Sequence, residues 1–423
     1  MPSATPVPRG PSVLALGSAA ELLARPGCPV CRYAAEASDR YLAWFAIEAH
    51  ADPVTITRLC ASLGMCARHT RGLMSQPGAA ARLTAVYRYL LQDAGERLGG
   101  TGRRPLAACP ACEHDQDAAG RALDTLLGEL PDAGVRERYT ELGGLCWPHA
   151  RAAAGTRGHR RAAAWIMQVT AVGTGRRASL DVLAGGPDHD AELRARLRAA
   201  LPPAGRLPPG TCPACLAAAR AELAELAGLA RAGTGGGRRP EDAEAKVSRQ
   251  ERCLCPGHLR DVVLASGDHG EAWLGWQAEC QAVVLARLAQ PPAWRRGGGA
   301  RGGWVRARST VAVDDSCPVC RAREQAARQE LRGRRTGPQA SPGGASPLCV
   351  RHVLAWRVAE PAAGTAAAAT AAKHAGTLIE ELTEAFRKGT WAFRHESRGT
   401  EMTAWRRAAA FLDGGVFGGC PPG

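Results

Sequence analysis

One cysteine and histidine pattern organises this chain: a CPxC motif followed downstream by a CxxH motif, four times in the same order. The CPxC motifs begin at residues 28, 109, 212 and 317, and the CxxH motifs begin at residues 66, 146, 255 and 349. Together they use three quarters of the 16 cysteines and four of the 11 histidines. Such self-similarity indicates duplicated structural units, each of which must bring thiols and an imidazole together.

Three cysteines and one histidine supply the four ligands of a closed tetrahedral zinc site, and structural zinc is therefore the predicted cofactor, with four ions per chain. The spacing within each motif lets both of its ligands face one ion from the first turn of a helix. We expect each CPxC to pair with the CxxH that follows it in the same unit. The predicted groups are Cys28, Cys31, Cys66 and His69; Cys109, Cys112, Cys146 and His149; Cys212, Cys215, Cys255 and His258; and Cys317, Cys320, Cys349 and His352.

Other chemistries for the same residues are weaker matches. An iron–sulfur cluster is the alternative cofactor, because three thiolates and one histidine can also hold iron. A thioredoxin-like couple would need a βαβ setting and no distant CxxH. A catalytic zinc ion would need an open coordination position, whereas protein side chains fill all four positions here.

The pattern of apolar residues predicts an all-α fold with about four helices per unit. Tyr33, Ala37, Tyr41 and Phe45 form one stripe at helical spacing, and no segment alternates with the period of a strand. In the segment 51–64, an aspartate followed by proline predicts a helix N-terminus and a glycine predicts the end.

The repeat and the Gly- and Pro-rich segments divide the chain into tandem parts. The predicted boundaries are a disordered tail at 1–25, unit 1 at 26–98, unit 2 at 107–183, unit 3 at 210–290, a Gly- and Arg-rich linker at 291–312, and unit 4 with a C-terminal helical segment at 313–414.

Segments 28–70 and 385–415 resemble an uncharacterised, mainly actinobacterial family built around CPxC and a glycine-preceded CxxH motif. The resemblance supports the metal assignment and implies no activity. Unit 3 departs from the pattern, because Cys253 stands where a glycine would usually precede the cysteine, so Cys253 could compete with Cys255 as a ligand.

The net charge of +14 favours anionic partners, although arginine supplies all but three of the 54 basic residues, which also suggests a GC-rich genome. The N-terminal apolar run is too short for a signal peptide, and no segment is long and apolar enough for a membrane span. We therefore expect a cytoplasmic protein without a membrane partner, whose cysteines bind metal rather than form disulfides.

Two segments outside the repeat could bind partners. The stretch 293–310 combines arginine, tryptophan and glycine, which suits single-stranded nucleic acid but is also typical of a flexible linker. Near the C-terminus, mixed charges and a tryptophan could form a binding surface, although an amphipathic terminal helix explains the same pattern. The residues of this possible surface are Lys388, Trp391, Arg394, His395, Glu396 and Glu401.

The sequence thus favours a non-enzymatic scaffold with structural zinc and a basic surface for a partner, most simply another protein. One alternative is an enzyme of specialised metabolism with structural zinc and a site near the C-terminal segment. Another is a nucleic-acid-binding regulator, whose arginines would have to cluster on one face.

Overall fold

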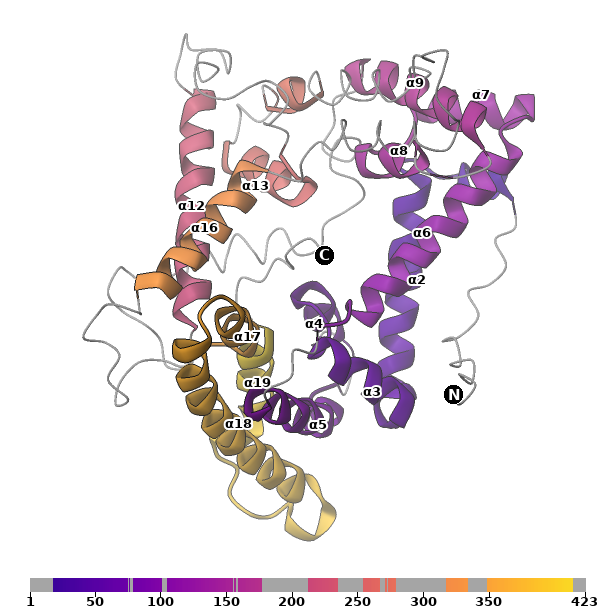
Figure 1. Cartoon of the computed structure of the whole chain (residues 1–423). Helices are drawn as coiled ribbons and strands as arrows, with labels where there is room; N and C mark the ends of the chain where they lie inside the picture. Colours follow the sequence, from indigo (N-terminus) through magenta and orange to yellow (C-terminus); the bar gives the residue numbers. More distant parts are fainter. Residues whose placement is uncertain are drawn as a thin grey trace, which may run out of the picture.

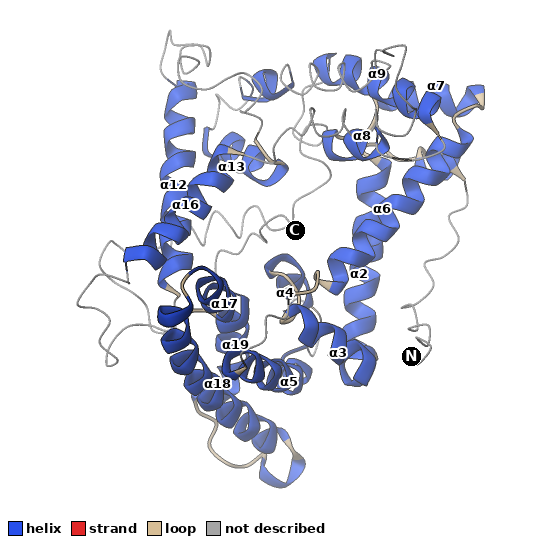
Figure 2. Ribbon diagram, in the orientation of Figure 1, coloured by secondary structure: helices blue, strands red, loops and turns tan. Residues whose placement is uncertain are grey.

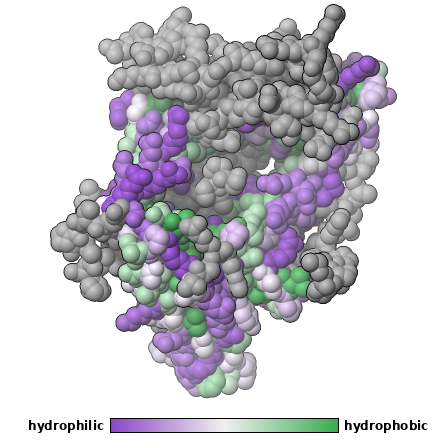
Figure 3. Space-filling model, viewed as in Figure 1, coloured by the Kyte–Doolittle hydropathy of each residue, from purple (hydrophilic) through white to green (hydrophobic). Residues whose placement is uncertain are grey.

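The computed structural model describes residues 18–74, 76, 79–100, 105–154, 156, 159–176, 212–234, 254–266, 271, 273–278, 317–333 and 348–413. Within these ranges every regular element is a helix, which confirms the predicted all-α fold (Figures 1 and 2). No helix within the same ranges combines the length and the apolar character needed to cross a bilayer. Where these residues are visible in Figure 3, hydrophilic side chains cover much of the long helices on both sides of the molecule.

The N-terminal half, residues 18–176, is built around two long helices that pack against each other, α2 and α6. Tyr41 in the second half of α2 stacks on His114 in the first turns of α6, so the two helices run antiparallel. Shorter helices close the two ends of this pair. The elements are α1 (Ala19–Leu22), α2 (Pro29–Ile47), η1 (Ala49–Ala51), α3 (Pro53–Ser62), α4 (Ala67–Met74), α5 (Ala79–Gly99), α6 (Pro110–Glu129), α7 (Ala133–Leu142), α8 (Trp147–Ala154) and α9 (Arg160–Arg176).

The C-terminal half, residues 212–413, repeats the plan with α12 and α16 as its packed pair. A long helix, α18, then extends away from this pair and ends in a tip of short turns (Figure 1). The elements are α12 (Pro213–Thr234), α13 (Pro256–Ser266), α16 (Pro318–Gly333), α17 (Val350–Ala359), α18 (Pro361–Gly389), η5 (Trp391–Phe393), η6 (Thr400–Thr403) and α19 (Ala404–Asp413).

Local sequence explains where the short helices begin and end. The Asp52 carboxylate accepts a hydrogen bond from the Thr55 backbone N–H at the start of α3, as predicted, and the next proline fixes the first helical turn. The helix ends slightly earlier than the glycine predicted, at Ser62, because Leu63 adopts a left-handed conformation with φ 55°. Leu63 is nearly fully buried, so packing holds a conformation that a leucine rarely adopts.

The two halves share one hydrophobic core where α5 of the first half packs on α18 and α19 of the second. Small alanines on α18 let the helices approach closely, and Leu90 and Leu91 on α5 are almost completely buried there. Arg357 of α17 also donates hydrogen bonds to the last carbonyls of α5, at 3.0 Å to Leu98 O and 3.0 Å to Arg97 O. This junction makes the two halves one packed unit.

Candidate metal centres

The structure brings all sixteen motif residues together in four groups of three cysteines and one histidine, with their ligand atoms within 4.8 Å of one another. We number the groups by the order in which they first appear along the chain. They are site 1 (Cys28, Cys31, Cys146 and His149), site 2 (Cys66, His69, Cys109 and Cys112), site 3 (Cys212, Cys215, Cys349 and His352) and site 4 (Cys255, His258, Cys317 and Cys320).

The expected pairing within each unit is wrong: every site joins the CPxC of one unit to the CxxH of its neighbour. Units 1 and 2 exchange their CxxH motifs reciprocally, and so do units 3 and 4. The cause is helix length. The 19 residues of α2 carry the chain about 28 Å away from its own CPxC, and the 10 residues of α3 are too short to return it. The antiparallel helix α6 instead brings its own N-terminus to that far end.

The interatomic distances fit a tetrahedral ion. Between closest sulfur atoms they are 3.4 Å at site 1, 3.7 Å at site 2, and 3.8 Å at sites 3 and 4. From the sulfurs to the histidine Nδ1 they run from 3.1 Å at Cys349 to 3.6 Å at Cys109. A tetrahedron with zinc–sulfur bonds of about 2.3 Å and a zinc–nitrogen bond of about 2.0 Å has edges of about 3.8 and 3.5 Å. The donor sets therefore fit zinc in size and in chemistry.

Two helix N-termini point at each site. In all eight motifs the first cysteine directly precedes a helix, from α2 after Cys28 to α17 after Cys349. In each CPxC the proline occupies the first helical position, where no N–H is needed. The free N–H groups and the positive end of the helix dipole stabilise thiolates, which are the metal-binding form of cysteine.

The thiols that surround each imidazole shift the pKa values of the cysteines and histidines at these sites. Burial acts to lower the pKa of His149, but the Cys28 and Cys31 thiolates outweigh it and raise this pKa to about 10. At Cys28 burial acts to raise the pKa, whereas hydrogen bonds from Cys146, Cys31 and His149 hold it well below its ordinary value. A metal ion must therefore displace a proton from the ring, so metal binding weakens as the pH falls.

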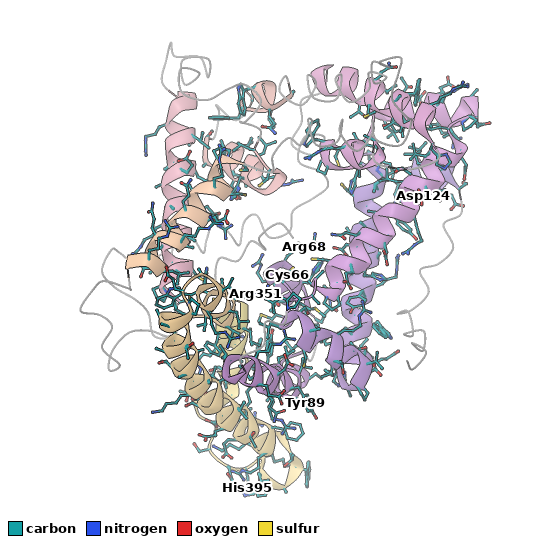
Figure 4. The ribbon with its side chains drawn as sticks, viewed as in Figure 1. Cys66, Arg68, Tyr89, Asp124, Arg351 and His395 are labelled. Atoms are coloured by element: carbon teal, nitrogen blue, oxygen red, sulfur yellow. The ribbon has the colours of Figure 1, made fainter. Side chains whose placement is uncertain are left out.

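At sites 2 and 4 a carboxylate lies beside the outer nitrogen of the histidine, Nε2, which faces away from the cysteines. An arginine forms an ion pair with each of these carboxylates. Asp115 lies 3.0 Å from His69 Nε2 and forms an ion pair with Arg68, which Figure 4 labels together with Cys66 of the same site. The motif spacing gave no sign of this residue, but its place six residues after Cys109, on the face of α6 that carries the ligands, could have drawn attention to it.

At site 4 the carboxylate comes from a different helix. Glu222 of α12 lies 3.5 Å from His258 Nε2, and its other oxygen lies 3.0 Å from Arg323 Nε of α16. Burial acts to lower the pKa of both histidines, but hydrogen bonds outweigh it and raise each pKa to about 11. These bonds come first from Asp115 at His69, and from Cys317 and Cys320 and then Glu222 at His258. The two halves thus reach the same arrangement from different positions.

Buried polar side chains fix the backbone just before two of the CxxH motifs. At site 1 the Leu145 N–H donates to Tyr139 Oη at 3.1 Å, and Tyr139 lies 3.0 Å from Thr170 Oγ1. At site 4 the Gln277 amide binds both backbone groups of Leu254, accepting at 3.2 Å and donating at 3.1 Å. Sequence reasoning missed these residues, whose only signal is a polar side chain within an apolar helix.

The C-terminal segment forms an exposed tip at the end of α18 rather than part of a metal site. Lys388 pairs with Glu401 at 3.0 Å, and Glu396 pairs with Arg387. Trp391 is 75% exposed and carries the Arg394 guanidinium on its ring. His395 is exposed and marks the end of the tip in Figure 4. The predicted amphipathic helix follows as α19, with Trp405 and Leu412 among its buried residues.

The cysteines outside the motifs lie apart from these groups or outside the described residues. Cys60 is half-buried on α3, where burial first and the Asp93 carboxylate second raise the pKa of its thiol to about 11. Cys255 belongs to the group at site 4, and Cys253 lies outside the described residues, so its competition with Cys255 stays a prediction. Cys280, Cys420 and the arginine-rich stretch 293–310 also lie outside the described residues.

Comparison of this chain with family models, with curated proteins and with solved structures gives no match. The resemblance of segments 28–70 and 385–415 to an uncharacterised family therefore stays a prediction.

Proposed function

We propose that this chain is a zinc protein in which four structural ions, one at each site, hold a helical scaffold that binds a protein partner. The observation that carries the proposal is that three thiols and an imidazole meet at tetrahedral distances four times, each time at two helix N-termini. Protein side chains fill all four positions of each site, which is typical of structural rather than catalytic zinc.

Each ion would fix helix starts that the chain itself does not hold together. At site 1 the two motifs lie more than a hundred residues apart in the sequence, and the ion would join the N-terminus of the short α8 to that of α2. Because such a site does not exist in the unfolded chain, the free energy of zinc binding adds directly to folding.

The exposed tip supports the partner half of the proposal. We define the aromatic tip as Phe386, Trp391 and Phe393, whose side chains are each more than a third exposed. Arginines lie on these rings, with Arg387 at 4.4 Å from the centroid of Phe393. Exposed aromatics together with arginine are typical of the centres of protein interfaces.

Metal content tests the structural half. We expect the purified, colourless protein to contain four zinc ions per chain by elemental analysis, and Cys146→Ser to contain three. Cys60→Ser is the matched control, since Cys60 lies outside the four groups, and should keep four. A folded wild-type protein without metal, or a brown protein containing iron, contradicts the proposal.

Photo-crosslinking tests the partner half. A photoreactive residue in place of Trp391 should trap one defined protein in cell extract, because this side chain stands out from the tip. The same residue in place of exposed Gln168 on α9 is the control and should not trap that protein. Equal trapping from both positions, or none from 391, would remove the aromatic tip as the partner surface.

A further inference from the structure

The four sites differ in what surrounds the outer nitrogen of their histidines, although their ligands are the same. Two positions on the packed helices carry the carboxylates seen beside this nitrogen: six residues after the first cysteine of a CPxC, and ten residues after the first cysteine of the neighbouring CPxC. At site 4 the buried Asp261 of α13 also lies close to His258 and Glu222. At site 2 the first position is Asp115, and at site 4 the second position is Glu222. In both cases an arginine binds the carboxylate.

Alanine occupies both corresponding positions at the other two sites. They are Ala34 and Ala119 at site 1, and Ala218 and Ala327 at site 3. An alanine side chain cannot accept a hydrogen bond from an imidazole N–H. Each half of the molecule therefore contains one site with a carboxylate on its histidine and one site whose equivalent positions are apolar.

This difference recurs with different residues in the two halves. In the first half the carboxylate stands on the helix that carries the site's own CPxC, and in the second half it stands on the partner helix. The arginine also changes place, from the CxxH motif to α16. The shared feature is thus the hydrogen-bonded carboxylate itself and not one inherited side chain.

A carboxylate on the outer nitrogen of a metal-bound histidine fixes the ring's tautomer and orientation and increases its basicity. Loss of such a partner typically lowers metal affinity 10- to 100-fold. The carboxylates at sites 2 and 4 are largely shielded from water, because Glu222 is almost fully buried and Asp115 is mostly buried.

We infer that the chain holds its metal ions in two classes: sites 2 and 4 retain zinc, and sites 1 and 3 exchange it. This inference rests on the proposed zinc function and adds a regulation to it. At low zinc availability the protein keeps two ions, one in each half, while α8 and α17 lose the ion at their N-termini. Arg351 of α17 donates to Ser62 O at 3.2 Å, so site 3 adjoins the contact between the halves.

Stepwise removal of zinc tests the inference on the full chain. The loaded protein is mixed with excess 4-(2-pyridylazo)resorcinol, whose colour reports each released ion. We expect two equivalents to leave at least tenfold faster than the other two. Alkylation with N-ethylmaleimide after the fast phase, followed by mass spectrometry, should label the cysteines of sites 1 and 3. These are Cys28, Cys31, Cys146, Cys212, Cys215 and Cys349.

Variants assign the slow class to the carboxylates. Asp115→Ala gives site 2 the surroundings of site 1 and should move one equivalent from the slow to the fast phase. The double variant Glu222→Ala with Arg323→Ala gives these two positions of site 4 the alanines of site 3 and removes the ion pair as a whole, and it should move another equivalent. Asp117→Ala and Glu225→Ala, on the same helices, are the controls and should leave two slow equivalents.

The outcomes separate this inference from the proposed function. A protein that binds fewer than four zinc ions contradicts the proposed function, and the two classes with it. Four ions that leave in a single phase, equal labelling of all sites, or carboxylate variants that release zinc like their controls overturn the two classes alone and leave the structural role of zinc intact.

Discussion

At the scale of single residues, buried side chains outside the motifs help to position sites 1, 2 and 4. The cysteines and histidines are recognisable because their spacing recurs, and the structure gathers all sixteen of them. Gln277 is different, because nothing in its neighbourhood marks it, yet it is completely buried and binds both backbone groups of Leu254. The buried amide makes the hydrogen bonds that water would otherwise make to the Leu254 backbone, and it holds the loop in place beside Cys255.

We therefore expect Gln277→Leu to destabilise the protein and to loosen site 4. The change leaves the N–H and the C=O of Leu254 buried without their partner, which costs about 2–4 kcal/mol. Urea unfolding of the zinc-loaded protein measures the loss. Gln168→Leu, at an exposed position on α9, is the matched control and should change the free energy of unfolding by less than about 0.5 kcal/mol. Equal stability of the two variants would show that the Gln277 hydrogen bonds are dispensable.

At the scale of elements, the length of the helices decides which motifs meet. In units 1 and 2 a CPxC and the next CxxH are separated by one long and one short helix, so they finish at opposite ends of the packed pair. Pairing within a unit would be possible only if the intervening helices could bring both motifs to the same end of the packed pair. The apolar stripe from Tyr33 to Phe45 already indicated a helix long enough to rule out that pairing.

Cys66→Ser distinguishes the two pairings directly. Because Cys66 belongs to site 2, its loss should expose the cysteines of unit 2, so that Cys109 and Cys112 react with N-ethylmaleimide while Cys28 and Cys31 stay protected. Mass spectrometry of the labelled peptides measures this. The Cys60→Ser variant, six residues earlier on α3, is the control and should leave both pairs protected. Labelling of Cys28 and Cys31 in Cys66→Ser would instead support pairing within the unit.

At the scale of the whole molecule, the two halves are joined by helices that come after the metal sites in each half. Neither α5 nor α18 carries a motif residue, yet the core that they share includes Cys66 and Cys109 of site 2 and Cys212 and Cys349 of site 3. Arg357 closes this junction, because its guanidinium binds three carbonyls at the end of α5, where a helix has unsatisfied acceptors and a negative dipole end.

Arg357→Ala should weaken the junction while leaving the metal sites intact. Loss of these charged hydrogen bonds costs about 1–3 kcal/mol. We expect faster amide hydrogen exchange in the last turn of α5 and the first turn of α18, with four zinc ions still bound. Arg332→Ala, at an exposed position in the last turn of α16, is the control and should leave exchange at the junction unchanged. Unchanged exchange in Arg357→Ala would show that apolar packing alone holds the halves together.

The helical class, the residues that gather in the four groups and the capping of individual helices could be predicted from the sequence, because each of these depends on residues near one another in the chain. Asp52 binds an N–H three residues away, and a CxxH needs only one helical turn to present both ligands. Tertiary structure alone decided which motifs meet, which histidines lie beside a carboxylate, and how α5 meets α18. Those outcomes depend on the antiparallel packing of helices distant in sequence, where small differences in helix length and in the facing side chains select one partner over another.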